Sequence, residues 1–221
     1  MEETSWISGL DLGKVNDFSA LVVLKRISFV PEDQRMVRTL AGTWVPDPDQ
    51  VIEKAFRRYV ISYLERFPLG TTYPAVCDRV VKVFDQAPLT GSNLAVDQTG
   101  VGVPVVDMLR VAKPKLQAVL RPVTITSGMT VTPDGAGWHV PKKDLVGVLQ
   151  VLLQSHRLTM AVGVPHAKIL AKELETFKVK ITANANEQLE AWRERDHDDL
   201  VLSVAMALWV AERGVKQFWM R

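Results

Sequence analysis

An apolar segment at residues 200–211, directly after Asp198 and Asp199, restricts the fold of this chain more than any other feature. Its apolar residues recur at helical spacing, which predicts a helix over 198–213. The segment is interrupted by Ser203 and is about half as long as the ~20 residues that a membrane-spanning helix needs. We therefore expect it to be buried in a soluble core, with the two preceding carboxylates held at the rim of that core.

Composition agrees with a protein of this kind. The chain has 221 residues, of which 47% are hydrophobic, enough for a substantial core. Its formal net charge is only +2, so any affinity for nucleic acid has to come from a local basic patch. Cys77 is the only cysteine, which excludes an intrachain disulfide and a cysteine-built zinc site. The N-terminal sequence has no basic stretch followed by an apolar one, so we expect a cytoplasmic protein that does not associate with membranes.

The order of apolar segments predicts a single domain over 1–221 with an α/β fold, a mixed sheet flanked by helices. The first three strands are expected to pair as an antiparallel meander, at residues 6–12, 19–26 and 36–45. Asp49 and the apolar spacing after it predict a helix through Arg66, whereas 67–92 give no clear assignment. The later elements are expected as a strand at 93–97, a helix at 103–111, a strand at 116–123, a helix at 141–155, a short segment at 157–161 and a helix at 166–177.

Four carboxylates lie where strands end and where the last helix begins. Asp11 ends the first strand, Asp97 ends the strand at 93–97, and Asp198 and Asp199 begin the last helix. Each position alone has a structural explanation, as a turn or a helix cap, but two caps are not needed where one suffices. A sheet can bring such ends together, and carboxylates gathered there repel one another unless cations are present. Their oxygen atoms suit Mg²⁺ or Mn²⁺, and two such ions can activate a water and stabilise the leaving oxygen of a phosphodiester.

Three sequence blocks occur in the same order as in a known protein family. They are GLDLGKVNDFSALVVL at 9–24, LAVDQTGVGVPVVDMLR at 94–110 and HDDLVLSVAMAL at 197–208. Together they resemble the nuclease domain of the large terminase subunit of tailed bacteriophages, and HDDLV is the most specific of them. The segments at 140–160 and 170–179 also look like later parts of that domain, so the resemblance covers most of the chain.

The resemblance implies a ribonuclease H-like fold and a metal-dependent endonuclease that cuts double-stranded, concatemeric DNA during genome packaging. Carried over residue by residue, it makes Asp11, Asp97 and Asp199 the principal ligands of two Mg²⁺ or Mn²⁺ ions. Asp198 is similar to an adjacent acidic residue that serves the same site, and Asp17 matches a secondary acidic position. The implied partners are duplex DNA, an ATPase motor domain or subunit, the small terminase subunit and the portal, in the cytoplasm of the bacterial host.

The chain differs from whole terminase subunits because it carries no ATPase motif. Its nearest approach to a phosphate-binding loop, GLDLGKV at 9–15, is one residue short and ends in Val where a hydroxyl should bind magnesium. The sequence is therefore expected to contain a nuclease domain and no ATPase domain. An excised domain and a stand-alone relative whose motor is another polypeptide both fit.

A local surplus of basic residues between 110 and 143 offers a candidate surface for DNA. Such residues could contact phosphates and position a duplex without reading its sequence, or could be solvated helix ends. The loop expected at 127–139 lies among them, with Trp138 expected to pack against the core. The candidate contacts are Arg110, Lys113, Lys115, Arg121, Lys142 and Lys143, accompanied by the single acid Asp134.

Other functions fit parts of the pattern. A junction resolvase or recombination nuclease of the same fold would use the same carboxylates, and a catalytically silent module remains an alternative. An actin-like phosphotransferase module shares the D-x-G turn, with Lys14 and Asn16 suitably placed, but needs a longer chain. His197 could assist the carboxylates as a ligand or proton carrier, although a helix-start position with a partly exposed ring is the simpler explanation.

Overall fold

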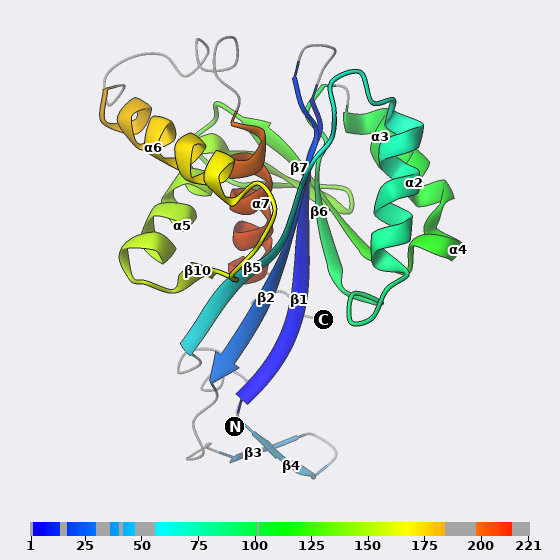
Figure 1. Cartoon of the computed structure of the whole chain (residues 1–221). Helices are drawn as coiled ribbons and strands as arrows, with labels where there is room; N and C mark the ends of the chain where they lie inside the picture. The colour runs from blue at the N-terminus through cyan, green and yellow to red at the C-terminus, as the bar shows by residue number, and fades with distance from the viewer. Residues whose placement is uncertain are drawn as a thin grey trace.

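An eight-stranded mixed sheet forms the centre of the molecule, as seen in the computed structural model (Figure 1). The structure describes residues 2–13, 17–29, 36–39, 42–46, 56–100, 102–183 and 198–213. The order of the strands across the sheet is β10-β5-β2-β1-β6-β7-β9-β8. Their bounds are Glu2–Asp11 for β1, Ala20–Phe29 for β2, Phe56–Arg66 for β5, Asn93–Asp97 for β6, Val119–Thr126 for β7, Thr132–Asp134 for β8, Gly137–Pro141 for β9 and Leu158–Met160 for β10.

The pairing of the strands divides the sheet into two parts. On one side of β1 the neighbours β2 and β5 pair antiparallel, with β10 added parallel to β5. On the other side β6, β7 and β9 run parallel to β1, and β8 closes the edge antiparallel to β9. A separate two-stranded sheet contains β3 (Met36–Arg38) and β4 (Trp44–Pro46). The strand β1 is therefore the element at which the antiparallel and parallel parts meet.

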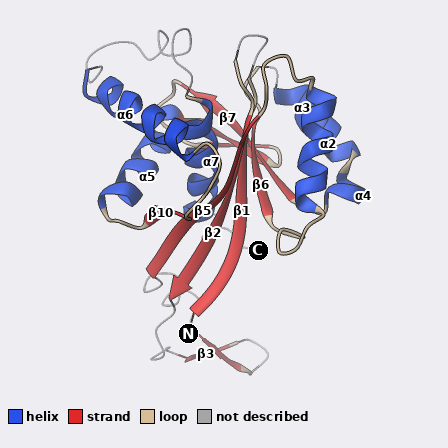
Figure 2. Cartoon of the chain, in the orientation of Figure 1, coloured by secondary structure: helices blue, strands red, loops and turns tan. Residues whose placement is uncertain are grey.

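Helices cover both faces of the large sheet (Figure 2). One face packs against α2 (Tyr73–Phe84), α3 (Gly102–Val111) and the short α4 (Lys113–Leu116), and the other against α5 (Lys142–Gln154), α6 (Ala167–Ala183) and α7 (Asp199–Arg213). Side chains that alternate along the strands feed two hydrophobic cores, one beneath each helical layer. Of the helices that the structure describes, none combines the length and apolar character needed to cross a membrane.

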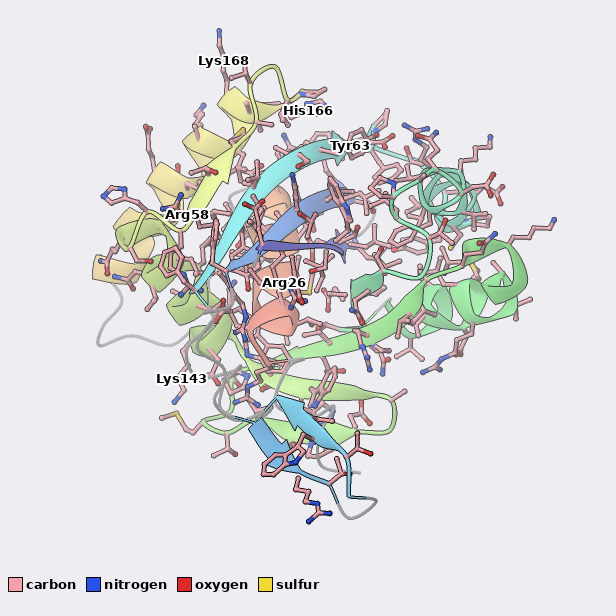
Figure 3. All side chains as sticks on the ribbon, turned by 90° about the horizontal axis from the view of Figure 1, so that it is seen from below. Arg26, Arg58, Tyr63, Lys143, His166 and Lys168 are labelled. Carbon is pink, nitrogen blue, oxygen red and sulfur yellow. The ribbon has the colours of Figure 1, made fainter. Side chains whose placement is uncertain are left out.

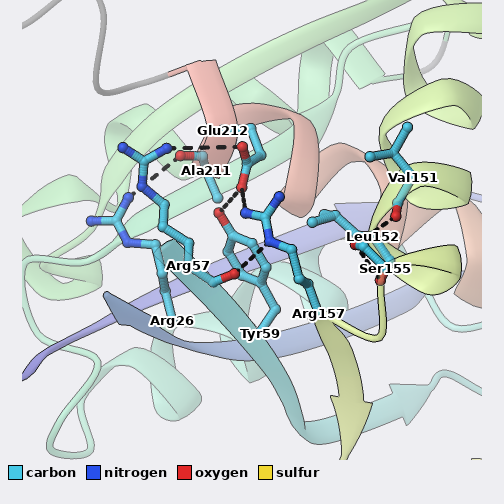
Figure 4. A network of polar contacts seen from close by, with 9 residues as sticks. All are labelled: Arg26, Arg57, Tyr59, Val151, Leu152, Ser155, Arg157, Ala211 and Glu212. Carbon is cyan, nitrogen blue, oxygen red and sulfur yellow. Dashed lines mark hydrogen bonds and ion pairs between the residues drawn. The ribbon is translucent and has the colours of Figure 1, made fainter. Parts of the chain in front are cut away.

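The helix α7 is buried on nearly all sides, which explains its unbroken apolar sequence. It packs directly beneath β1, where a Cβ atom added to Gly9 would lie 2.0 Å from the backbone oxygen of Ser203 and 3.2 Å from the Cβ of Ala207. Glycine at position 9 thus permits a contact that any side chain would block. The last turn is fixed by polar contacts as well, since Arg26 donates a hydrogen bond to the carbonyl of Ala211 (Figure 4).

A cluster of arginines surrounds Glu212, the penultimate residue of α7. Tyr59 donates a hydrogen bond of 2.7 Å to its carboxylate, Arg157 donates one of 2.9 Å, and Arg57 lies 3.8 Å away (Figure 4). Burial, together with the charge of Glu212, raises the pKa of Tyr59, so this hydroxyl stays a donor. The C-terminal end of α7 is thereby tied to β5 and to Arg157, the residue before β10.

Several expected elements are confirmed. The last helix, the strand at 93–97, the helix at 103–111 and the antiparallel pair at 6–12 and 19–26 all form. Trp138 packs edge-to-face on Trp209 with ring centroids 5.8 Å apart, so it is a packing residue as expected. The chain is an α/β protein with a mixed sheet flanked by helices.

Three expectations were wrong. Residues 56–66 form the strand β5 instead of the end of a helix, and β5, not the segment 36–45, is the third strand of the antiparallel part. Arg57, Tyr59 and Ile61 are buried in alternation, and β-branched and aromatic residues favour a strand here. The third error is the loop expected at 127–139, because most of the hairpin β8–β9 lies in this segment. Residues 47–55, where the helix was expected to begin, lie outside the described residues.

We predict that Gly9→Ala destabilises the protein by about 1–3 kcal/mol, because the added methyl group overpacks the contact between β1 and α7. Gly147→Ala in α5 is the matched control, since a Cβ there meets no atom within 4 Å and alanine favours a helix. Chemical denaturation of both variants measures the difference. Equal stability of the two variants would contradict this account of the contact.

Candidate metal centre

Asp11 and Asp97 lie side by side because their strands are neighbours. β1 and β6 run parallel with Leu10 opposite Val96, so the aspartate that follows each of these residues ends its strand at the same edge. Both are buried, with exposed fractions of 5% for Asp11 and 7% for Asp97. The carboxyl ends of these two central strands therefore present two carboxylates at one point.

The start of α7 brings two further carboxylates to the same place. Asp199 is 5% exposed and Asp198 precedes it, with the carbonyl of Asp198 accepting the first helical hydrogen bond from Leu202. The pKa of Asp11 is raised well above its ordinary value, first by burial and then by the charges of Asp97, Asp199 and Asp198. The structure thus brings together Asp11, Asp97, Asp198 and Asp199. Asp17 is exposed and is not among the groups that act on Asp11.

Asp97 is positioned by the turn that follows it. Its Oδ1 accepts a hydrogen bond of 2.8 Å from the backbone N–H of Thr99, and the hydroxyl oxygen of Thr99 accepts one of 2.8 Å from the N–H of Ile125. The first residue of α3 also approaches closely, since a Cβ on Gly102 would lie 2.0 Å from the carbonyl oxygen of Asp97. These contacts account for the sequence DQTG as a strand-exit turn that holds the carboxylate in place.

Two basic side chains enter the carboxylate cluster. Arg66, the last residue of β5, places Nη2 3.2 Å from Oδ2 of Asp199, and its guanidinium carbon lies 3.7 Å from the ring centroid of Phe18. Lys142, the first residue of α5, places Nζ 3.6 Å from Oδ2 of Asp198. Its charge lowers the pKa of Asp11 and so opposes part of the carboxylate repulsion. Cations from two different elements thus offset part of the negative charge.

Glu173 on α6 is a fifth carboxylate, which sequence reasoning missed. Its Oε2 accepts hydrogen bonds from the backbone N–H groups of Leu200 and Val201, at 3.1 and 3.2 Å, and so caps α7 from another helix. Its Oε1 lies 4.0 Å from Nη2 of Arg66. Burial raises its pKa to about 7, against the lowering effect of the backbone hydrogen bonds and Arg66. No local motif signals this role, because Glu173 and α7 are brought together only by tertiary packing.

The donors at this edge fit a hard divalent cation by their chemistry. They are carboxylate oxygens, and their mutual repulsion leaves a buried excess of negative charge that a cation would relieve. In the part of the chain that the structure describes, no three acidic, histidine or cysteine side chains are already arranged to hold a metal. Asp198 and Asp199 are instead ion-paired with Lys142 and Arg66. A metal that uses Oδ2 of Asp198 or of Asp199 would therefore have to replace the protein cation at that oxygen.

The other basic residues of the 110–143 region do not gather on one surface. Arg110 on α3 pairs with Asp107, and Arg121 on β7 donates a hydrogen bond to Asn93. Lys143 on α5 is exposed, at the periphery of the molecule in Figure 3, with Nζ 3.5 Å from the sulfur of Met129. Since α3 and α5 cover opposite faces of the sheet, these residues form at least two separate basic regions. Lys113 lies in α4 and Lys115 is exposed there, whereas His197, Lys14 and Asn16 lie outside the described residues.

Two sequence comparisons with known proteins found no match. The chain matches no protein-family model, and no curated protein matches its sequence.

We predict that the metal-free protein becomes less stable as the pH rises from about 4 towards neutrality, and that Asp11→Asn reduces this loss. The pKa of Asp11 is higher in the folded state than in the unfolded chain, so the folded state binds more protons over this interval. The stability contributed by protonated Asp11 is therefore lost as the pH rises through its folded-state pKa.

Denaturation in EDTA at several pH values measures this slope, with Asp78→Asn on the exposed side of α2 as the control. A slope for Asp11→Asn as steep as that of the control would show that Asp11 does not carry the repulsion. Glu173 contributes to the slope in the same direction, so the variant should flatten the curve without levelling it.

Proposed function

We propose that this protein is a metal-dependent DNA endonuclease that hydrolyses phosphodiester bonds in double-stranded DNA. The observation that carries the proposal is the convergence of Asp11, Asp97, Asp198 and Asp199, from two adjacent strands and one buried helix, at one edge of the sheet. Four carboxylates gathered in a buried place cost stability, as the raised pKa of Asp11 indicates. Such a cost is typical of a site retained for its chemistry.

The arrangement of the sheet supports a ribonuclease H-like fold. An antiparallel unit of β1, β2 and β5 is followed by the parallel strands β6 and β7, and the first strand ends in an aspartate. The sequence resemblance to the terminase nuclease domain points the same way. On this proposal the substrate is concatemeric DNA in the cytoplasm of a bacterial host, delivered by an ATPase motor with the small terminase subunit and the portal.

Within this proposal each residue has a distinct task. Asp11, Asp97 and Asp199 would hold Mg²⁺ or Mn²⁺, with Asp198 beside them. Two such ions would supply an activated water and stabilisation of the leaving oxygen. Arg66 keeps Asp199 in place from the side of β5, and Glu173 fixes the first turn of α7 on which Asp199 lies. Rigid placement of this kind keeps the ligands within the narrow geometry that hydrolysis needs.

The choice of substrate separates terminase-type activity from that of a junction resolvase, which would use the same carboxylates. A resolvase is expected to prefer a four-way junction, whereas a terminase-type nuclease cuts linear or plasmid duplex with little sequence preference. Competition between a labelled junction and a labelled duplex of equal length tests this choice. An actin-like module would need a second large lobe, and the described residues form only one large sheet.

We predict that Asp97→Ala lowers plasmid cleavage in Mg²⁺ or Mn²⁺ by about 100-fold or more, because it deletes a metal ligand. Its melting temperature in EDTA should stay equal to that of the wild type or rise, since one repelling charge is gone. Asp107→Ala on α3 is the control, because Asp107 is exposed and pairs with Arg110 on the same helix. Cleavage by Asp97→Ala at the wild-type rate would overturn the assignment.

The identity of the metal gives a further prediction. Ca²⁺ should bind the protein and support little or no cleavage, because its looser coordination does not hold the attacking water and the phosphate in line. Calorimetry with Ca²⁺ and a plasmid assay in Mg²⁺, Mn²⁺, Ca²⁺ and EDTA test this together. Robust cleavage in Ca²⁺, or in excess EDTA, would contradict a two-metal mechanism.

A further inference from the structure

Lys142 has an unusual position for a lysine. It is 8% exposed, and its ammonium group enters the carboxylate cluster from the first turn of α5, where it pairs with Asp198. Its neighbour Lys143 has the same charge and lies on the same helix, yet its side chain is exposed and its ammonium group lies 3.5 Å from the sulfur of Met129. Burial of an ammonium group is costly unless negative charge compensates it. The position of Lys142 is therefore a response to the carboxylates and not a general property of this helix end.

The two cations of the cluster differ in how firmly they are held. Arg66 is stacked on Phe18 and lies between Asp199 and Glu173, so its planar guanidinium is fixed on three sides. Lys142 carries a single point charge on a flexible stem of four carbons. Its ion pair with Asp198, at 3.6 Å, is longer than the 3.2 Å pair of Arg66 with Asp199. Displacing the stacked and doubly paired guanidinium of Arg66 would break more of these contacts than moving the flexible side chain of Lys142 away from Asp198.

We propose that Lys142 is a built-in counter-ion that occupies Asp198 in the metal-free protein and must leave this carboxylate before Asp198 can ligate a divalent cation. The inference rests on the proposed function and gives Lys142 a role in regulating metal binding at the same site. An ammonium group and a divalent cation repel each other strongly when both contact the same carboxylate. Lys142 therefore lowers the affinity for metal and, at the same time, limits the carboxylate repulsion while metal is missing.

Duplex DNA supplies the charge that Lys142 needs when it leaves Asp198. A backbone phosphate brought to the cluster offers the ammonium group a second anionic partner, so DNA binding favours release of Asp198. By linkage, bound DNA then raises the affinity for metal, and bound metal raises the affinity for DNA by the same factor. Lys142 thus couples metal loading to the presence of substrate, whereas Lys143 has no such role.

The first test is titration of the full chain with Mn²⁺ by calorimetry, without DNA. Lys142→Met should bind Mn²⁺ about tenfold more tightly than the wild type, because the competing charge is gone. Lys143→Met is the matched control and should bind as the wild type does. Lys142→Arg, which keeps the charge, should also stay near the wild-type affinity. Unchanged or weaker Mn²⁺ binding by Lys142→Met, or equal tightening in Lys142→Arg, would overturn the proposal.

Thermal denaturation gives a second readout that does not depend on cleavage. In EDTA, Lys142→Met should melt below the wild type because the carboxylates lose a counter-ion, and saturating Mn²⁺ should raise its melting temperature more than that of the wild type. Lys142→Gln, which keeps a hydrogen-bond donor for Asp198, carries the same two expectations if the methionine variant does not fold. A smaller rise with Mn²⁺ than in the wild type would count against the proposal.

The coupling to DNA is tested with Ca²⁺, which allows a duplex to be present without rapid cleavage. A short duplex should increase the Ca²⁺ affinity of the wild type severalfold and have a much smaller effect on Lys142→Met. Equal increases in both would overturn the coupling. If the wild type cleaves DNA and binds Mn²⁺ but Lys142→Met behaves as the wild type does, this inference is wrong and the proposed function is unaffected. Loss of Mn²⁺ binding in every variant, together with absent cleavage, defeats the proposed function as well.

Discussion

The packing of α7 beneath β1 is the contact on which the rest of the structure depends. Because Gly9 lets the helix backbone approach the strand, α7 lies in the core with little freedom to slide or rotate. Its N-terminus then falls at the carboxyl ends of β1 and β6, and its C-terminus at the arginines around Glu212. Contacts from distant elements, such as those of Glu173 and Arg66, fix the N-terminal end. The packing that fixes the position of α7 therefore also fixes the positions of the carboxylates at its N-terminus.

This constraint brings the negatively charged carboxylates close together, and two basic side chains of the protein lie among them. Arg66 and Lys142 offset Asp199 and Asp198, yet the pKa of Asp11 remains raised, so compensation is incomplete. A fold under pressure for stability alone would replace such a cluster by apolar residues at little cost. The remaining repulsion is stored free energy that a divalent cation can release on binding. This balance links the stability of the metal-free protein to the chemistry that we propose for it.

Elements with strong local signals were predictable from the sequence, and elements determined by distant contacts were not. The apolar sequences of α7 and β6 are strong local signals, so both elements were predicted. Their aspartates were recognised as candidates because they lie at a strand end and at a helix start. β5 has apolar residues that fit helical and strand spacing alike, and only its pairing with β2 decides between them. Glu173 and Arg66 meet α7 from 27 and 133 residues away, at Leu200 and Asp199, which no local pattern can reveal. Lys142 looked like a surface residue because its partner Asp198 is equally remote in sequence.

The most direct test of the central claim is a crystal soaked with Mn²⁺ and measured at a wavelength where manganese scatters anomalously. We expect anomalous density within coordination distance, about 2.0–2.3 Å, of carboxylate oxygens of Asp11, Asp97 and Asp199. We also expect that the ammonium group of Lys142 no longer lies against Asp198 in that crystal. Anomalous density confined to other carboxylates, or none at Mn²⁺ concentrations that support cleavage, would contradict the account.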